Sequence, residues 1–156
     1  MRYIMTAILQ RVTEASVAVC GIEIGHCKRG LLILLCVKKG VTGCDALALA
    51  EKISKLRIFS DENGKMNLSV TDVAGGALVI SQFTLCANYA HGNRPDFLDA
   101  APPAEADALY RSFTALLGER IGDGRVESGE FGADMQVSLI NDGPVTIIME
   151  SGVLIK

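Results

Sequence analysis

The chain has 156 residues, enough for one ordinary domain and too few for two. Its 49% hydrophobic and 21% charged residues are typical of a globular protein and exclude an intrinsically disordered chain. The formal net charge of −3 excludes nucleic-acid binding through a broad positive surface, but it leaves open local contacts to one end of a structured nucleic acid. We therefore expect a single domain over residues 1–156.

The N-terminal part of the chain predicts strands. Residues 8–13 and 15–19 are rich in β-branched side chains and partly alternate, and residues 22–24 follow a Cys-Gly turn, which indicates a hairpin. The continuous apolar run 31–37 lies between turn signals and predicts a strand that is buried on both faces.

A helix follows these strands. Thr42 and Asp45 have the spacing of a helix N-cap box, in which a hydroxyl is followed three residues later by an acid. Apolar residues then recur at helical spacing from Ala46 to Leu56. A short strand at 57–60 and an Asn-Gly turn come next.

The middle of the chain combines a strand, a long loop and a second helix. Residues 77–85 predict a strand, and the polar, turn-rich residues 87–101 predict a loop that is functional or mobile. Pro102 and Pro103 suit the first turn of a helix, and Gly118 suits its C-terminal cap.

The last third of the chain returns to strands, at 125–128, 134–140 and 145–150, with Asn141–Pro144 as a break between the last two. Strands and helices therefore do not alternate one for one. This order predicts an α+β fold with a mixed or antiparallel, barrel-like sheet and two main helices packed on it.

The five cysteines are odd in number and contain no CxxC pair, which argues against a disulfide framework and against a zinc site. Cys36 lies inside an apolar run and is interpreted as a small buried residue. Reduced thiols in the cytoplasm are the simplest interpretation. No apolar run approaches the roughly 18 residues of a transmembrane helix, and the N-terminus lacks the pattern of a signal peptide. We expect no membrane association, no metal and no other cofactor.

Familiar catalytic motifs are absent from the sequence, namely a GxGxxG after a strand, a Walker A loop, HExxH and GxSxG. The two histidines, His26 and His91, lie beside or within loops and are interpreted as solvated. With so few candidate bases, a mechanism that needs an acid–base pair from the protein has little support.

Two segments stand out against this background. Ser81–Thr84 places three polar side chains in an apolar strand, where they need partners or a ligand. The alternative is that Ser81 and Thr84 bond neighbouring backbone. Asn141–Thr146 contains Gly143-Pro144, for which composition alone predicts an ordinary trans turn.

Together these segments resemble the D-aminoacyl-tRNA deacylase family. The resemblance rests on SQFTL at 81–85, NRPxF at 93–97 and GxFGADMQVSLxNDGPVT at 129–146, and it runs over nearly the whole chain. Residues 1–4 lie outside it as a possible non-family extension, with Met5 as a second candidate start, and so does the tail from Ser151.

The resemblance implies hydrolysis of the ester that joins a D-amino acid, or glycine, to the 3′-terminal adenosine of tRNA. L-aminoacyl-tRNA is rejected, so the reaction is chirality proofreading in translation. The resemblance also implies a homodimer with its active sites at the subunit interface. Its catalytic tract maps onto Ser81, Gln82, Phe83 and Thr84.

The same resemblance implies a chiral gate, in which Gly143 and Pro144 form a Gly-cis-Pro element that projects from the neighbouring subunit. Arg11 braces this element, although an exposed strand arginine is the alternative interpretation. Met135 packs near the gate or in the core, and Phe131 lines the adenosine pocket or simply packs. The loop after SQFTL departs from the family pattern, so the resemblance does not indicate how the acceptor stem is held; Arg94 and Lys65 are candidate phosphate contacts.

Two mechanisms stay open at this point. Thr84 is a nucleophile, or the 2′-hydroxyl of the terminal ribose helps to activate water while the N–H groups of Phe83 and Thr84 hold the developing oxyanion. We prefer the second, because no base is evident near Thr84. Other functions are an RNA-end binding module without turnover, a small esterase that uses Thr84 or Ser81 and ignores chirality, and a relative that acts on L-alanyl-tRNA. That relative would have a trans Gly-Pro and no bracing arginine.

Overall fold

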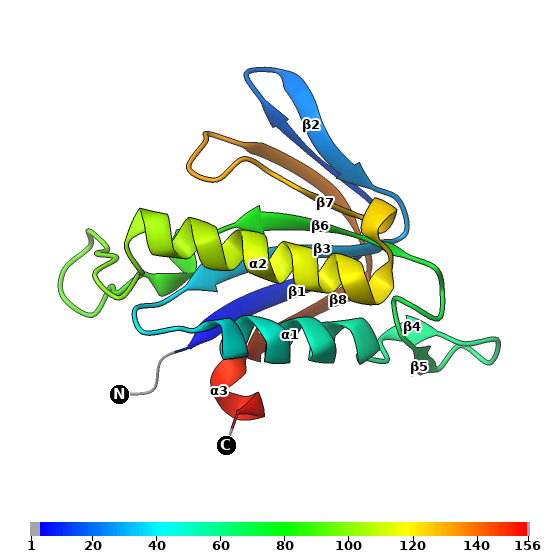
Figure 1. Ribbon diagram of the computed structural model, residues 1–156. Helices are drawn as coiled ribbons and strands as arrows, with labels where there is room; N and C mark the ends of the chain where they lie inside the picture. Colours follow the sequence, from blue (N-terminus) through cyan, green and yellow to red (C-terminus); the bar gives the residue numbers. More distant parts are fainter. Residues whose placement is uncertain (1–3, 156) are drawn as a thin grey trace.

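The computed structural model describes residues 4–155, and the predicted α+β architecture is confirmed. A mixed sheet curls into a nearly closed, barrel-like layer, and two long helices, α1 (Gly43–Lys55) and α2 (Pro103–Ile121), lie side by side on one face of it (Figure 1). The interpretation of residues 1–3 as an extension lies outside the described residues.

The sheet is organised around the long strand β1 (Met5–Val19). Three strands pair with it in antiparallel fashion: β2 (Ile22–Cys27), β3 (Gly30–Val37) and β8 (Gln136–Glu150). Two further strands continue the sheet in parallel from β3: β6 (Gly76–Ser81) and β7 (Val126–Ser128). Because β3 has a neighbouring strand on each side, its backbone polar groups are satisfied. Its side chains are buried on both faces of the sheet, as the apolar run predicts.

The main core lies between the sheet and the two helices. It is built mostly from aliphatic side chains, with Phe113 of α2 and Phe59 fully buried among them. The α1 N-terminus has the predicted cap, since the Thr42 N–H donates to the Asp45 carboxylate at 2.9 Å. Asp45 also accepts from the buried Ser151 hydroxyl at 2.7 Å, which ties the short C-terminal helix α3 (Ser151–Leu154) to α1.

Small elements complete the chain. They are β4 (Phe59–Ser60), β5 (Met66–Leu68) and the 3₁₀ helices η1 (Phe83–Cys86) and η2 (Asp123–Arg125). Among the described residues no helix is long and apolar enough to cross a membrane.

Several predicted boundaries are wrong; the strands expected at 8–13 and 15–19, for example, form the single strand β1. β6 ends at Ser81 instead of Leu85, because the chain turns into η1, where the Leu85 N–H donates to the Gln82 carbonyl. The helix α2 continues past Gly118 to Ile121, because the Gly122 N–H donates to the Gly118 carbonyl and Gly122 itself takes the positive φ of 117°. The two C-terminal strands form the single strand β8. Inside it residues 142–145, which we call the Gly143-Pro144 loop, have no paired partner on β1.

The prediction for the cysteines is also wrong in one respect. Cys36 on β3 and Cys86 at the end of η1 form a disulfide, although their positions 50 residues apart gave no sign of it in the sequence. Both residues are buried, so the interpretation of Cys36 as a buried residue holds. The disulfide joins β3 directly to the turn that follows Ser81–Thr84.

The five cysteines are expected to differ in their reactivity toward an alkylating reagent. At about pH 8, iodoacetamide is expected to modify the exposed Cys20 and Cys44 in the native protein and to leave Cys27 untouched. Burial raises the pKa of the Cys27 thiol to about 11, so its thiolate is scarce. Peptide mass spectrometry before and after reduction in denaturant measures this. Modification of Cys36 or Cys86 without reductant would contradict the pairing.

Candidate active site

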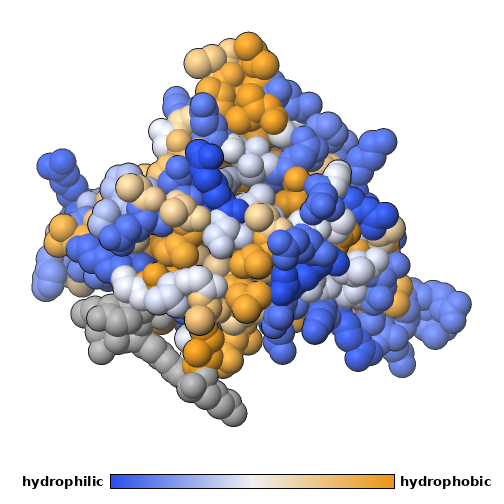
Figure 2. Space-filling model, in the orientation of Figure 1, coloured by the Kyte–Doolittle hydropathy of each residue, from blue (hydrophilic) through white to orange (hydrophobic). Residues whose placement is uncertain are grey.

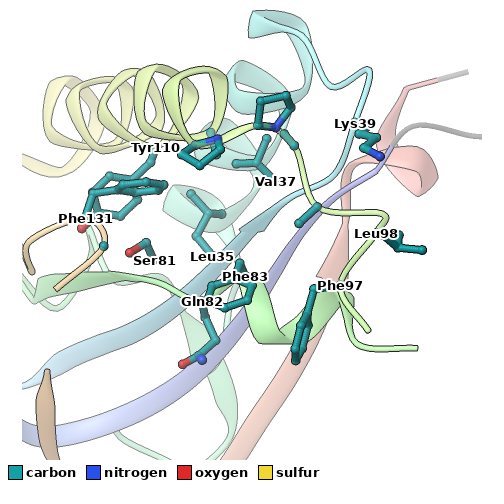
Figure 3. Close-up of a pocket in the computed structure, with 16 residues that line it drawn as sticks. Leu35, Val37, Lys39, Ser81, Gln82, Phe83, Phe97, Leu98, Tyr110 and Phe131 are labelled. Carbon is teal, nitrogen blue, oxygen red and sulfur yellow. The ribbon is translucent and has the colours of Figure 1, made fainter. Parts of the chain in front are cut away.

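A cavity of about 540 Å³ opens between the end of β6, the chain around residues 97–103 and the start of α2. Its lining is mainly apolar, with Leu35 and Val37 at one wall and Tyr110 and Phe131 at another (Figure 3). An apolar recess of this size is typical of a small-molecule site. The described residues that line it include no histidine and no carboxylate.

Ser81, Gln82 and Phe83 line a partly exposed side of this cavity (Figure 3), which we call its mouth. Thr84 is exposed and is not among the residues that line the cavity. The parallel pairing of β6 with β3 carries the chain to this point, and the Gln82 N–H donates to the Leu35 carbonyl at 2.8 Å. The tract then leaves the sheet. The Gln82 side-chain amide donates to the Thr84 hydroxyl, so Thr84 bonds another member of the tract rather than the neighbouring backbone.

The backbone of the tract has two N–H donors without an acceptor inside the 3₁₀ helix η1. Phe83 and Thr84 are the first two residues of η1, and the first N–H groups of a helix have no acceptor inside the helix. The Phe83 ring is 59% exposed and packs edge-to-face on Phe97, with ring centroids 5.1 Å apart. A partly exposed aromatic pair therefore flanks two available N–H groups.

Tyr110 forms the inner wall of the cavity and was not predicted as a site residue. It belongs to the apolar stripe of α2, and its hydroxyl donates to the Val79 carbonyl at 2.7 Å. Burial raises the pKa of Tyr110, so it is a neutral donor and no base at physiological pH. The Phe131 ring lies 6.0 Å from the Tyr110 ring, centroid to centroid. One signal in the sequence could have pointed to it: Tyr110 lies in the apolar stripe of the helix, and the hydroxyl of a buried tyrosine needs a hydrogen-bond partner.

Arg11 holds the Gly143-Pro144 loop. Its Nε donates to the Asp142 carbonyl at 2.9 Å, and its Nη1 donates to the Ile58 carbonyl at 2.7 Å. The residue is only 9% exposed, so the alternative of an exposed strand arginine is wrong. The peptide bond between Gly143 and Pro144 is cis, which corrects the trans turn that composition alone predicts.

The loop and the polar tract do not meet within one chain. Ser81 pairs with Leu35, which pairs with Ala7, whereas the loop lies opposite Arg11, four residues along β1. That offset alone is roughly 13 Å along the strands. Gly143 and Pro144 are exposed, so their backbone is available to a neighbouring molecule.

Met135 belongs to neither group. It packs against the smaller core cluster around Val12 and Ile80 and lies close to Gly129, so the structure favours the core interpretation. Phe131, by contrast, lines the cavity beside Ser81.

Comparison with known proteins identifies the family of this chain. Residues 8–150 match the family model described as D-Tyr-tRNA(Tyr) deacylase. The chain belongs to this deacylase family. Proteins named D-aminoacyl-tRNA deacylase from Dinoroseobacter shibae and Cereibacter sphaeroides are 57% and 56% identical to it. Each alignment covers 94% of this chain, and the two alignments cover 99% and 100% of the respective relative.

Two solved structures are similar to this chain in fold. The c-Myc DNA Unwinding Element Binding Protein has a TM-score of 0.87 at 41% identity, over 92% of this chain and 97% of its own. A probable eukaryotic D-amino acid tRNA deacylase has a TM-score of 0.79 at 18% identity, over 94% and 99% of the two chains, which shows that the fold is shared.

Proposed function

We propose that this chain hydrolyses the ester bond of D-aminoacyl-tRNA and glycyl-tRNA in the cytoplasm and rejects L-aminoacyl-tRNA. The observation that carries the proposal is a polar tract with free backbone donors at the mouth of an apolar cavity, in a chain that also holds an exposed Gly-Pro loop on a buried arginine. The names of the relatives at 57% and 56% identity support the same reaction.

The cavity suits the terminal adenosine of tRNA. A purine base needs aromatic or aliphatic surface on its faces, and Tyr110 and Phe131 supply it at the inner wall. With the base seated there, the 3′-ester would lie toward Ser81, Gln82 and Phe83 at the mouth. Lys39, at the opposite rim, is the one cationic side chain among the described residues that line the cavity.

Handedness would be read at the Cα and not in a side-chain pocket, because pocket contacts discriminate by size and polarity. Backbone close to the Cα clashes with an L side chain and leaves a D side chain free to point to solvent. Gly143 and Pro144 suit this role, since glycine lets backbone approach closely and Arg11 fixes the loop. Glycine has no Cβ and would pass the same gate.

A second copy of the chain would bring the gate to the tract. Within one chain the two are far apart, and we propose a two-fold dimer in which each loop would lie against the partner's site. Surface composition supports association: Leu139, Ile140 and Ile148 are exposed on β8, and Ile22 and Ile24 form an apolar cluster at the tip of the β1–β2 hairpin (Figure 2).

The substrate itself would supply the group that activates the attacking water. Among the described residues that line the cavity, none is placed to activate a hydroxyl nucleophile, because Lys39 lies at the far rim and Tyr110 stays neutral. The 2′-hydroxyl of the terminal ribose would assist the attacking water. The N–H groups of Phe83 and Thr84 would stabilise the oxyanion, and Gln82 and Ser81 would position the ester.

Replacing Thr84 by alanine is expected to leave single-turnover deacylation of D-tyrosyl-tRNA within a few-fold of wild type. The hydroxyl accepts a hydrogen bond from Gln82 and has no base beside it, whereas the backbone N–H is kept. A tRNA that ends in 2′-deoxyadenosine is expected to lose about 100-fold or more, because a positioned catalytic group contributes about 10²–10⁴ in rate. The opposite pattern, a large loss with Thr84→Ala and none with the deoxy substrate, would establish the nucleophile.

Deacylation of matched D- and L-tyrosyl-tRNA by the purified protein tests the proposed function. The expected result is fast hydrolysis of the D substrate and none of the L substrate above the uncatalysed rate. Equal rates would indicate a simple esterase, and binding without turnover would indicate an RNA-end binding module.

A further inference from the structure

The Asn141 side chain closes the loop that carries Gly143-Pro144. Its Oδ1 accepts from the Val145 N–H at 2.7 Å. Its Nδ2 lies 3.2 Å from both the Val145 carbonyl oxygen and the Thr146 hydroxyl. One planar amide therefore acts as acceptor and donor across the base of the loop.

These bonds replace a missing part of the sheet. Asn141 pairs with Val12 and Thr146 pairs with Gln10, so only Arg11 of β1 lies opposite residues 142–145. The loop thus stands away from the β1–β8 ladder. Val145 is buried, and its N–H is satisfied by Asn141 instead of by β1.

The loop is held at two points. At its first residue, the Asp142 carbonyl accepts from Arg11. At its last residue, Val145 is held by Asn141. Gly143 and Pro144, between these points, are exposed and have no polar side chain that could anchor them. Their position therefore depends on both anchors.

We infer that Asn141 is a positioning residue that fixes Gly143-Pro144 and thereby sets the selectivity for D over L substrates. This inference rests on the proposed function. Asn141 acts through the loop and does not touch the reacting atoms. An aspartate at this position keeps an acceptor of the same shape, but it loses both donor bonds and adds a negative charge next to Asp142.

The test is the ratio of kcat/KM for D-tyrosyl-tRNA to that for L-tyrosyl-tRNA, measured for wild type, Asn141→Asp and Asn141→Ala. Wild type sets only a lower limit on this ratio, because its L hydrolysis is expected to stay at the uncatalysed rate. We expect both variants to hydrolyse L-tyrosyl-tRNA measurably, so that the ratio falls at least tenfold below that limit. A change in the folded fraction scales both rates equally, so it cannot move the ratio. Asn63→Asp makes the same chemical change in an exposed turn and is expected to leave the ratio unchanged.

The possible outcomes separate the inference from the proposed function. A wild-type protein that discriminates, together with variants that keep the wild-type ratio, overturns the role of Asn141 and leaves the function standing. A wild-type protein that does not discriminate overturns the function and this inference with it. Asn141→Asp serves as the decisive variant if Asn141→Ala gives little soluble protein.

Discussion

Replacing Gly143 by alanine is expected to lower kcat/KM for D-tyrosyl-tRNA by about 10- to 100-fold and to weaken the rejection of L-tyrosyl-tRNA. A Cβ at this position would lie 2.8 Å from Val145 Cγ2 and 2.9 Å from the Val145 backbone nitrogen. The φ of +150° is one that L-residues rarely adopt. Strain of this kind costs about 1–3 kcal/mol, so the loop would move instead of accepting the methyl group.

Single-turnover deacylation of both substrates measures this effect. Gly124→Ala is the matched control, because a Cβ at Gly124 meets nothing within 4 Å, and it should behave as wild type. An unchanged D rate together with intact L rejection in Gly143→Ala would show that Gly143 takes no part in the gate.

Replacing Phe83 by proline is expected to reduce the rate of deacylation by about 10²–10³, the usual cost of removing one oxyanion donor. Proline has no N–H, and Phe83 is the first residue of η1, a position that proline tolerates well. Gln82 has φ −143° and ψ 73°, outside the helical region that a following proline disfavours. The substitution therefore removes the donor and keeps the turn.

Phe83→Ala separates the N–H from the ring. It keeps the donor and removes the aromatic contact with Phe97, so we expect only a modest rise in KM. The measurement is kcat and KM for D-tyrosyl-tRNA in both variants. Comparable losses in kcat for Phe83→Ala and Phe83→Pro would assign the effect to the ring and contradict the role of the backbone.

Most of the fold could be predicted from sequence because local signals agreed with the tertiary structure. The apolar run at 31–37 is a strand buried on both faces, and the Thr42–Asp45 spacing begins a helix. The end of β6 at Ser81 could not be predicted, because Phe83 and Leu85 continue the apolar pattern and the turn depends on tertiary contacts. The Cys36–Cys86 disulfide depends on the same meeting of β3 and η1.

The candidate site was predicted less completely than the fold. Polar residues in an apolar strand pointed to Ser81–Thr84, and family resemblance pointed to Gly143 and Arg11. The role of Tyr110 as a cavity wall was missed, because a helix stripe does not reveal which of its members borders an open space. The contact of Arg11 with Ile58 was missed because it joins residues 47 positions apart.

Heterodimers made from variant subunits test the central claim, that one subunit's loop completes the other subunit's site. A tandem-purified heterodimer of Phe83→Pro and Gly143→Ala subunits has one site with an intact pocket and an intact gate, and it should regain about half of wild-type D-tyrosyl-tRNA deacylation. A heterodimer of wild type with the Phe83→Pro/Gly143→Ala double variant has no such site and should stay about tenfold or more below wild type, the residual level expected from a pocket that meets a Gly143→Ala gate. The reverse result, activity only with the wild-type and double-variant pair, would show that each chain supplies its own gate and would contradict the account.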